Sequence, residues 1–395
     1  MSSAEIGSVL RRQGIALAWE AISEEAAIVA TDKLFDAKTL LVTLGGTIKI
    51  GTMLPSNTTT EQWVRDRKTD GRIVVGVSVY KSATGVSNAK CEEALRTVRG
   101  EVLVAKRVLK EEGKSLRLVT TRDRILPSVA LVTEHMLERG GELVVFLSNN
   151  GAMQFGETLA VQAFHEYRSR DMGRPSRDAL RGMLPQKVAQ MMINLAGVAE
   201  SGTICDPFCG SGTVLSEAAL LGYNVIGSDI AQAAVEDTQK NFQFLSTTYN
   251  LQLTTDNLFT SDVRSLADHL EKQSVDAIVT EPFLGPPLTG KESSVLLGKT
   301  RRDIQALVTD AFESFMKILR PGGRVVIVFP VLGGELLPID DILKSGWRLV
   351  SLLPSVIASP AKQSLTSRGT ILYSRADQHL AREITVWERE TKKIG

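Results

Sequence analysis

A strand that ends in a glycine-rich turn and leads into a helix limits the possible folds of this chain more than any other segment. The residues from Thr203 to Thr213 read Thr-Ile-Cys-Asp-Pro-Phe-Cys-Gly-Ser-Gly-Thr, and an apolar helical pattern follows them. Gly210 and Gly212 allow a tight turn and let the main chain approach a ligand with no Cβ in the way. Taken alone, such a turn also suits a plain strand-to-helix connection, so its surroundings must decide.

An acidic residue follows the turn at an informative distance. Asp229 ends the next predicted strand and lies 23 positions after Asp206. At that interval, the carboxylate of a second strand can accept hydrogen bonds from ribose hydroxyls. A nicotinamide-binding turn would need a third glycine, Gly-x-Gly-x-x-Gly, where this chain has Leu215. The pattern therefore favours a nucleoside-containing ligand other than a nicotinamide dinucleotide.

The string from Asp206 to Thr213, with Asp229 behind it, resembles motif I of class I S-adenosylmethionine-dependent methyltransferases. The likeness is greatest to the branch that methylates amino groups of nucleic acids. It implies that S-adenosyl-L-methionine is the cofactor and that Asp229 binds its ribose hydroxyls. The residues implied at its methionine end are Asp206, Phe208, Gly210 and Gly212.

Asp262 follows a third predicted strand, in Thr260-Ser261-Asp262-Val263. The resemblance implies that its carboxylate takes the adenine amino group of the cofactor. The alternative is that Asp262 is the N-cap of a helix over 263–270, because aspartate is a favoured N-cap residue.

The fourth predicted strand, 275–280, ends in Glu281-Pro282-Phe283-Leu284-Gly285. The amino-methylating enzymes that it resembles carry Asp/Asn-Pro-Pro-aromatic at this place. An exocyclic base amine is a poor nucleophile because its lone pair is delocalised into the ring. An oxygen that accepts its N–H bonds orients the lone pair, and an aromatic ring stacks on the base, which is worth ~1–3 kcal/mol. Such catalysis depends on alignment and electrostatic fit.

The loop departs from that pattern because one proline, not two, precedes Phe283. If Phe283 is the aromatic, Thr280 stands in the acceptor's position; if Glu281 is the acceptor, Leu284 stands in the aromatic's position. We favour Glu281 as acceptor and Phe283 as stacking ring, on a loop reshaped around Pro282. A rigid, non-catalytic loop is the alternative.

Residues 164–196, with the glycine turn behind them, resemble the tRNA guanosine-10 N2-methyltransferase family of archaea and eukaryotes. The block runs from Phe164-His165-Glu166-Tyr167-Arg168 through Gly182-Met183-Leu184-Pro185 to Met191-Met192-Ile193-Asn194. The resemblance implies an α/β protein whose RNA-binding half precedes a mostly parallel, seven-stranded Rossmann-like sheet. The expected divisions are a ferredoxin-like subdomain at 1–58, a THUMP-like RNA-binding domain at 59–163, an arginine-rich linker at 164–187, a methyltransferase domain at 188–375 and a polar tail at 376–395.

The balance of charge hides local basic segments. The chain of 395 residues has 46 Lys+Arg and 45 Asp+Glu, which excludes a polycationic DNA-coating protein. Residues 95–124, however, hold nine basic and four acidic residues, and the predicted linker holds six and three. Such footprints are typical of phosphate-binding surfaces, although a solvated helical face is the alternative. The candidate RNA contacts are Lys106, Arg107, Lys110, Arg117, Arg170 and Arg174.

The positions of the cysteines bear on metal binding and on covalent catalysis. The cysteines Cys91, Cys205 and Cys209 lack zinc spacing and all precede the catalytic loop. We therefore expect no metal and no covalent cysteine intermediate. With no signal peptide and no apolar run of ~18 residues, the expected chain is soluble and cytoplasmic.

Together these patterns predict an S-adenosylmethionine-dependent enzyme that methylates the N2 amine of a guanosine in tRNA. The alternatives are a non-catalytic RNA-binding protein with a methyltransferase fold and an amino-methyltransferase for another nucleic acid. The sequence leaves open the modified nucleotide, mono- versus dimethylation, the need for a small activator subunit and the oligomeric state.

Overall fold

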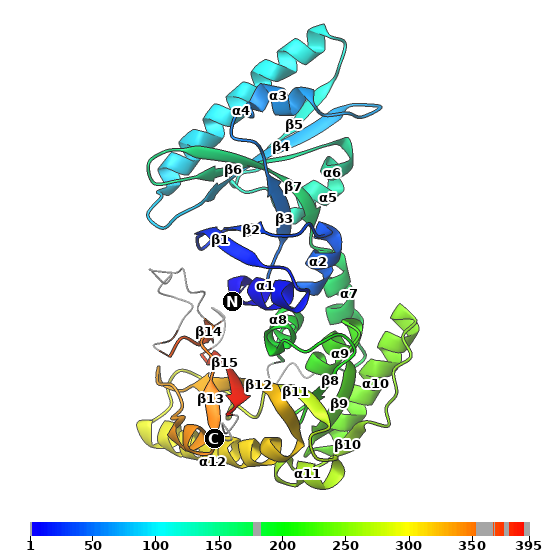
Figure 1. Cartoon of the computed structure of the whole chain (residues 1–395), viewed down its shortest axis with the longest axis vertical. Coiled ribbons are helices and arrows are strands. Elements are labelled where there is room, and N and C mark those ends of the chain that lie inside the picture. The colour runs from blue at the N-terminus through cyan, green and yellow to red at the C-terminus, as the bar shows by residue number, and fades with distance from the viewer. Residues whose placement is uncertain (1, 177–182, 353–365, 367, 375–378, 391–395) are drawn as a thin grey trace. The chain divides into compact units, whose positions relative to one another are not determined.

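A computed structural model describes residues 2–176, 183–352, 366, 368–374 and 379–390. By its internal contacts the chain divides into two compact units. The larger unit comprises Met1–Gly14, Thr43–Gly46 and His165–Gly395, and the smaller unit comprises Ile15–Val42 and Thr47–Phe164 (Figure 1). The chain therefore passes from the larger unit into the smaller unit and back twice.

The smaller unit is built on a mixed sheet with the strand order β3-β7-β6-β4-β5. Strand β4 is parallel to β5 and β6, and the β3–β7 and β6–β7 pairs are antiparallel. The strands are β3 (Lys49–Met53), β4 (Ile73–Lys81), β5 (Leu116–Val119), β6 (Gly140–Leu147) and β7 (Met153–Val161). A separate hairpin joins β1 (Leu17–Ile22) and β2 (Ala27–Thr31). The remaining helices are α2 (Ala37–Thr43), α3 (Thr60–Arg65), α4 (Asn88–Glu111), α5 (Ser128–Thr133) and α6 (Met136–Arg139).

Helix α4 covers one face of this sheet because of its sequence pattern. Ser87 caps its first turn by accepting the Lys90 N–H, and buried residues such as Cys91, Leu95, Val98 and Val102 recur at three- and four-residue intervals. This apolar stripe packs against the alternate β4 and β6 residues that face it. The opposite face of the helix carries the basic residues of 95–111 and also exposes Leu103 and Val104.

The larger unit contains a sheet with the strand order β10-β9-β8-β11-β12-β15-β13, and β14 also pairs with β15. Strands β10, β9, β8, β11 and β12 are parallel, whereas β15 is antiparallel to its neighbours. The expected α/β fold with a mostly parallel seven-stranded sheet is confirmed, and β14 adds an eighth strand. The strands are β8 (Thr203–Asp206), β9 (Asn224–Asp229), β10 (Leu258–Thr260), β11 (Val275–Thr280), β12 (Leu319–Val331), β13 (Trp347–Leu349), β14 (Ile371–Tyr373) and β15 (Ala381–Arg389).

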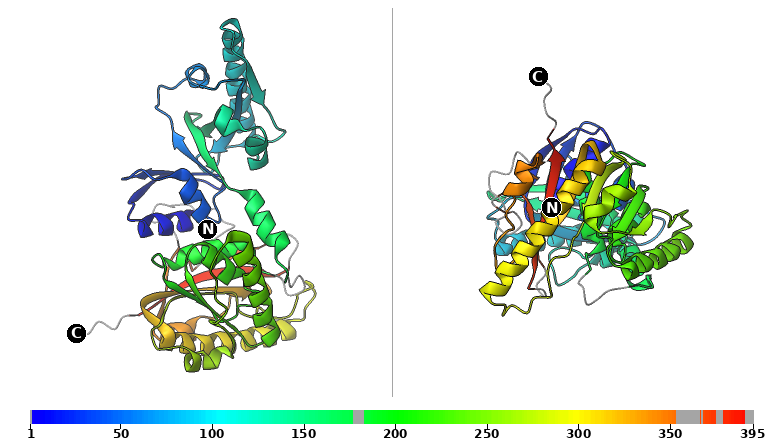
Figure 2. Two further views of the ribbon diagram at one scale, coloured as in Figure 1. Left: turned by 90° about the vertical axis from the view of Figure 1, so that its right-hand side faces the viewer. Right: turned by 90° about the horizontal axis from the view of Figure 1, so that it is seen from below.

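Helices cover both faces of this sheet (Figure 2). Neighbouring strand residues alternate between the two cores: Ile204 belongs to one and Cys205 to the other. Helices α8, α9 and α10 contribute to the first core, and α11, α12 and α13 to the second. These helices are α8 (Gln186–Ala196), α9 (Thr213–Leu220), α10 (Gln232–Tyr249), α11 (Leu266–His269), α12 (Ser294–Ile318) and α13 (Asp340–Lys344). Because both faces are covered, the ends of the strands are the surfaces left for a ligand.

The N-terminal helix α1 (Ser2–Arg12) belongs to the larger unit, and a buried carboxylate is among the groups that hold it there. Glu5 accepts hydrogen bonds from the N–H groups of Gly45 and Gly46, at 2.7 and 3.0 Å, and from Asn194 Nδ2 at 2.7 Å. These partners join α1 to the 43–46 loop and to α8. The division by contacts therefore differs from the predicted boundary at residue 58, which had grouped this helix with the strands that follow it.

The predicted linker 164–187 contains regular structure. Helix α7 spans Phe164–Gly173, and α8 begins at Gln186. Residues 177–182 of this linker, and residues 376–378 and 391–395 of the predicted tail, lie outside the described residues. We name residues 164–176 the connector segment.

Candidate active site

The order of strands in the larger unit reverses between β8 and β11. The chain runs from β8 outward through β9 to β10 and then returns to place β11 on the other side of β8. In open α/β sheets a crevice forms at such a switch point, outside the carboxyl ends of the strands. The glycine turn, Asp229, Asp262 and Glu281 all follow strands at this edge.

The glycine turn adopts the conformation that its sequence predicts. Gly210 and Gly212 have φ angles of +53° and +79°, in the left-handed region that favours glycine. A Cβ on Gly212 would lie 2.7 Å from Thr238 Cγ2, whereas one on Gly210 would have no heavy atom within 4 Å. The turn is thus packed on one side at Gly212 and open at Gly210. Helix α9 starts directly after it, so its first N–H groups add a site that favours negative charge.

Asp206 and Thr280 join the carboxyl ends of β8 and β11. Thr280 Oγ1 donates to Asp206 Oδ1 at 2.6 Å, and the Phe208 N–H donates to the same oxygen at 3.2 Å. Burial raises the pKa of Asp206 to about 7, and the nearby Asp229 and Glu281 charges add to this, while the two hydrogen bonds oppose it. Thr280, the acceptor in one alignment of the loop, is fully buried, whereas the side chain of Glu281 next to it is partly exposed.

The raised pKa predicts a pH effect on stability. The pKa of Asp206 in the folded protein, about 7, lies above the ordinary aspartate pKa of 3.8. The native state therefore holds the Asp206 proton more tightly than the unfolded chain does. The resulting stabilisation is complete below the ordinary value and is lost as the pH rises through about 7. We expect Asp206→Asn to gain stability relative to the parent protein between pH 5 and pH 8. Urea denaturation across this range measures the difference, and parallel pH profiles would contradict the assignment.

Asp229 connects the second strand to the glycine turn. Its Oδ2 accepts the Gly210 N–H at 3.0 Å, and its Oδ1 accepts the Ala231 N–H at 2.9 Å. The predicted pair of turn and carboxylate is therefore brought together in the structure. The role of Asp229 toward ribose hydroxyls stays a prediction.

Asp262 follows β10, the next strand at the same edge. Its side chain caps the short helix Val263–Ser265, accepts the Arg264 N–H at 3.0 Å and pairs with the Arg264 guanidinium at 2.5 Å. The hydrogen bond from Arg264 lowers the pKa of this carboxyl. The structure thus has the N-cap arrangement that the sequence offered as the alternative, and the adenine contact stays a prediction.

Glu281 is held by a cation that the sequence did not indicate. Arg382 Nε donates to Glu281 Oε1 at 2.6 Å, and the two side chains are 4% and 14% exposed. Burial raises the pKa of Glu281, and the Arg382 charge opposes that rise. Arg382 stands near the start of β15, which is antiparallel to β12 and so brings its first residues to the site edge. The two residues are 101 positions apart, and Arg382 falls in the predicted polar tail at 376–395, where the structure instead has β15.

The residues after Glu281 divide between core and solvent. Pro282 is buried and Leu284 packs against the core that contains α8, α9 and α10. Phe283 is 61% exposed. Phe283 therefore presents an exposed ring on which a base can stack, whereas the Leu284 side chain is packed against the core.

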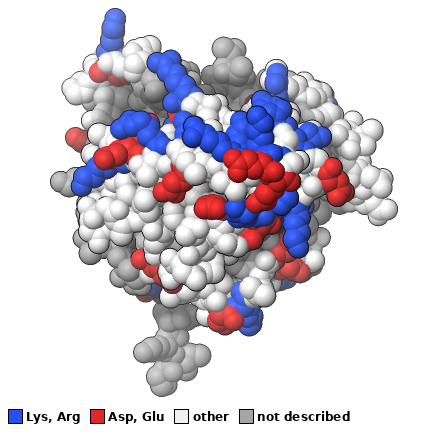
Figure 3. Space-filling view, turned by 90° about the horizontal axis from the view of Figure 1, so that it is seen from above, with Lys and Arg blue, Asp and Glu red and all other residues white. Residues whose placement is uncertain are grey.

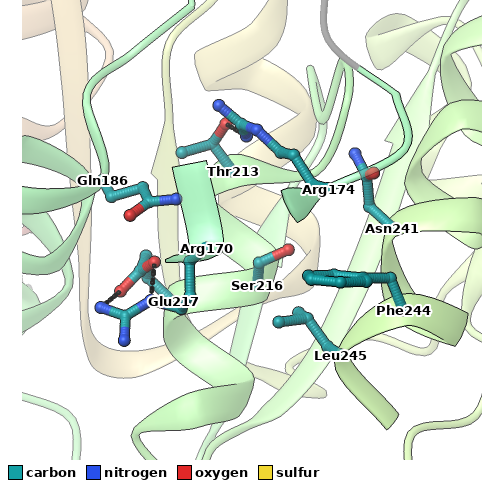
Figure 4. A pocket seen from close by; sticks show the side chains of 9 residues that line it. All are labelled: Arg170, Arg174, Gln186, Thr213, Ser216, Glu217, Asn241, Phe244 and Leu245. Atoms are coloured by element: carbon teal, nitrogen blue, oxygen red, sulfur yellow. Dashed lines mark hydrogen bonds and ion pairs between the residues drawn. The ribbon is translucent and has the colours of Figure 1, made fainter. Parts of the chain in front are cut away.

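Two of the predicted RNA contacts are buried in the larger unit, and their role toward RNA stays a prediction. Arg170 and Arg174 are each 9% exposed. Arg170 Nε donates to Glu217 Oε1 at 3.1 Å, and Arg174 Nη1 donates to Thr213 Oγ1 at 3.0 Å (Figure 4). They line a small pocket that opens to solvent, whose other lining residues are Gln186, Thr213, Ser216, Glu217, Asn241, Phe244 and Leu245. The two guanidinium groups hold the connector segment to α9.

The other four predicted RNA contacts lie in the smaller unit. Lys106, Arg107 and Lys110 are on α4, where Arg107 and Lys110 are exposed. Arg117 on β5 is exposed and pairs with Glu134 at 2.8 Å. Figure 3 views the α4 side of this unit and shows a band of Lys and Arg side chains with Asp and Glu among them. Their role toward RNA stays a prediction.

Among the helices of the described residues, none combines the length and apolar character of a membrane span. Nor do these residues bring three or more His, Cys, Asp or Glu side chains together as ligands for a metal ion.

Comparisons with known proteins agree with the geometry of the larger unit. Residues 174–332 match the family UPF0020, described as RMKL-like, methyltransferase domain. The chain is 41% identical over 104 residues to a tRNA (guanine(10)-N2)-dimethyltransferase of Methanothermobacter thermautotrophicus, which covers 26% of this chain and 28% of the relative. It is 33% identical over 187 residues to the enzyme of the same name from Methanocaldococcus jannaschii, which covers 45% and 47%. The chain thus matches less than half the length of either relative.

Among solved structures, TrmN from Thermus thermophilus aligns over 98% of this chain and 96% of its own, with 14% identity and a TM-score of 0.48. The family resemblance predicted from the sequence is confirmed by the domain match and the two named relatives.

Proposed function

We propose that this chain, whose residues 174–332 match the RMKL-like methyltransferase domains, transfers a methyl group from S-adenosylmethionine to the N2 amine of a guanosine in tRNA. One observation supports this most strongly. The glycine turn and Asp229 are hydrogen-bonded together at the switch point of the sheet. Glu281 follows β11, which lies next to β8, the strand before the glycine turn. A nucleoside cofactor and an amine acceptor thus have adjacent places at one edge.

The residues present fit such a cofactor. At Gly210 a Cβ would point into open space, so the main chain can approach a ligand there, as a turn that binds one requires. Asp229 stands at the end of β9 beside that turn, where its carboxylate can accept bonds from ribose hydroxyls. Phe208 is partly buried beside Asp206, and Asp262 lies one strand further along. When bound, S-adenosylmethionine supplies an electrophilic methyl group on its sulfonium.

The loop after β11 suits the handling of an amine. Glu281 can accept N–H bonds from the amine and so turn its lone pair toward the methyl donor, and Arg382 fixes the direction of this carboxylate. Pro282 stiffens the loop, and the exposed Phe283 ring can stack on the guanine. Alignment and charge placement, rather than a covalent intermediate, would then lower the barrier.

The choice of substrate rests on the named relatives. Both relatives are named tRNA (guanine(10)-N2)-dimethyltransferase, and the resemblance of residues 164–196 points to the same family. We assign the THUMP-like RNA-binding role to the smaller unit and its basic α4. The three cysteines are buried free thiols, which suits the reducing cytoplasm where we place the enzyme.

A charge reversal on α4 tests the RNA contact. Arg107→Glu with Lys110→Glu removes two exposed cations from one helix. We expect tRNA affinity to fall at least about tenfold at low salt and the slope of log affinity against log salt to decrease by about two. Filter binding over a salt series measures both quantities. Lys38→Glu on α2 makes the same kind of change at another exposed site of the unit, and equal losses from it would contradict a local RNA face.

A non-catalytic RNA-binding protein remains the second candidate because Glu281 is already engaged by Arg382. Two measurements separate the candidates. Calorimetry with S-adenosylhomocysteine tests the cofactor site, and no binding at millimolar ligand would contradict it. Transfer of a labelled methyl group from S-adenosylmethionine into tRNA tests the enzyme, and cofactor binding without any transfer would favour the second candidate.

A further inference from the structure

Helix α10 presents two buried polar side chains to the glycine turn. Thr238 and Asn241 are three positions apart and so lie on one face of the helix. Thr238 Oγ1 donates to the Gly210 carbonyl at 2.8 Å, and Asn241 Nδ2 donates to the Ser211 carbonyl at 2.8 Å. The two side chains are 0% and 2% exposed. Successive carbonyls of the turn are thus fixed by one helix.

The Asn241 amide also holds the connector segment. Its Oδ1 accepts the Ser176 N–H and its Nδ2 donates to the Ser176 carbonyl, each at 3.0 Å. Ser176 Oγ donates in turn to Asp237 Oδ1 at 2.9 Å. Both amide hydrogens and the amide oxygen of Asn241 are therefore used. This one side chain links the connector to the turn.

We infer that Asn241 is a positioning residue for the cofactor site. It does not need to touch the cofactor, because it acts by holding the Ser211 carbonyl and with it the conformation of the turn from Gly210 to Gly212. A ligand bound by main-chain groups loses affinity when those groups are no longer held in one geometry. Through Ser176 the same amide makes the shape of the turn depend on the connector segment. This inference rests on the proposed function, in which the turn binds S-adenosylmethionine.

The inference predicts that loss of the Asn241 amide weakens cofactor binding and leaves the other kinetic constants nearly unchanged. We expect Asn241→Ala to raise the dissociation constant of S-adenosylhomocysteine and the KM for S-adenosylmethionine by about tenfold, the loss of roughly one well-placed hydrogen bond. At saturating S-adenosylmethionine, kcat and the KM for tRNA should stay within about twofold of the parent protein. A residue that only stabilised the fold would instead lower the fraction of active protein and leave the KM values unchanged.

Matched variants keep the test decisive. Gln243→Ala changes an exposed residue of the same helix and should leave all constants unchanged. At Thr238, Thr238→Ser keeps the hydroxyl and Thr238→Val keeps the shape without it. We expect the serine variant to retain cofactor affinity and the valine variant to lose it, which covers the case in which Asn241→Ala does not fold.

Hydrogen exchange of the ligand-free protein separates this inference from the proposed function. Mass spectrometry should show faster exchange in peptides covering the glycine turn and residues 173–176 for Asn241→Ala than for Gln243→Ala. Failure of the parent protein to bind S-adenosylhomocysteine would contradict the proposed function. The exchange experiment would still test whether Asn241 holds the glycine turn, because it uses the ligand-free protein. Equal exchange in the two variants, or unchanged cofactor affinity in Asn241→Ala and Thr238→Val, would overturn the inference.

Discussion

Glu281→Ala is expected to reduce methyl transfer by at least about 100-fold, because it removes a group placed to orient the amine. The affinity for S-adenosylhomocysteine should stay within about twofold, since the glycine turn and Asp229 do not bond to Glu281 in the structure. Initial rates at saturating tRNA and S-adenosylmethionine, together with calorimetry on the same preparation, measure the two effects.

A second substitution guards against a structural explanation. Glu281→Ala removes one hydrogen-bonded ion pair of the buried Arg382, which costs stability. Glu281→Gln keeps an amide oxygen that can accept bonds from both Arg382 and an amine, and it should retain more activity than the alanine variant. Near-normal turnover of Glu281→Ala would rule out Glu281 as the acceptor.

Arg170→Met is expected to lower the free energy of unfolding by about 3 kcal/mol near neutral pH, since it leaves the carboxylate of Glu217 buried without its partner. The two side chains are 10% and 3% exposed, and Arg170 also lies over the Tyr167 ring at 4.5 Å. Burial raises the pKa of Glu217 to about 6, against the Arg170 charge. The cost should therefore be smaller at pH 5, where Glu217 can take up a proton. Urea denaturation at the two pH values measures it.

The controls for Arg170 also test the alternative RNA role. Arg168→Met changes an exposed residue of the same helix and should alter stability by less than about 0.5 kcal/mol. Arg170→Met combined with Glu217→Leu removes both charges and should recover most of the lost stability. If the recovered double variant still bound tRNA much more weakly than the parent protein, Arg170 would contact RNA after all.

The parts of the site that the sequence predicted are those defined by local pattern. The strand, the glycine turn and the helix after it are adjacent in the chain, and positive φ angles at Gly210 and Gly212 follow from residue type. Asp229 could be placed because one strand and one helix separate it from the turn. In the same way, short apolar runs next to these motifs predicted β8, β9, β10 and β11.

Long-range partners were not predictable in this way. The linker at 164–187 was predicted from its excess of basic residues, yet helix α7 forms within it and Arg170 pairs with Glu217, 47 positions later in the chain. Local charge counting cannot tell a paired, buried arginine from an exposed one. The same holds for Glu281 with Arg382, and for Glu5, whose partner Asn194 is 189 positions away.

The most direct test of the central claim is to identify the methylated nucleoside. Unmodified tRNA is incubated with the protein and S-adenosylmethionine, digested to nucleosides and analysed by mass spectrometry against the Glu281→Ala variant. We predict N2-methylguanosine or its dimethylated form in the parent reaction and at least about 100-fold less with the variant. Absence of any new methylguanosine from a protein that binds S-adenosylhomocysteine would contradict the proposed activity.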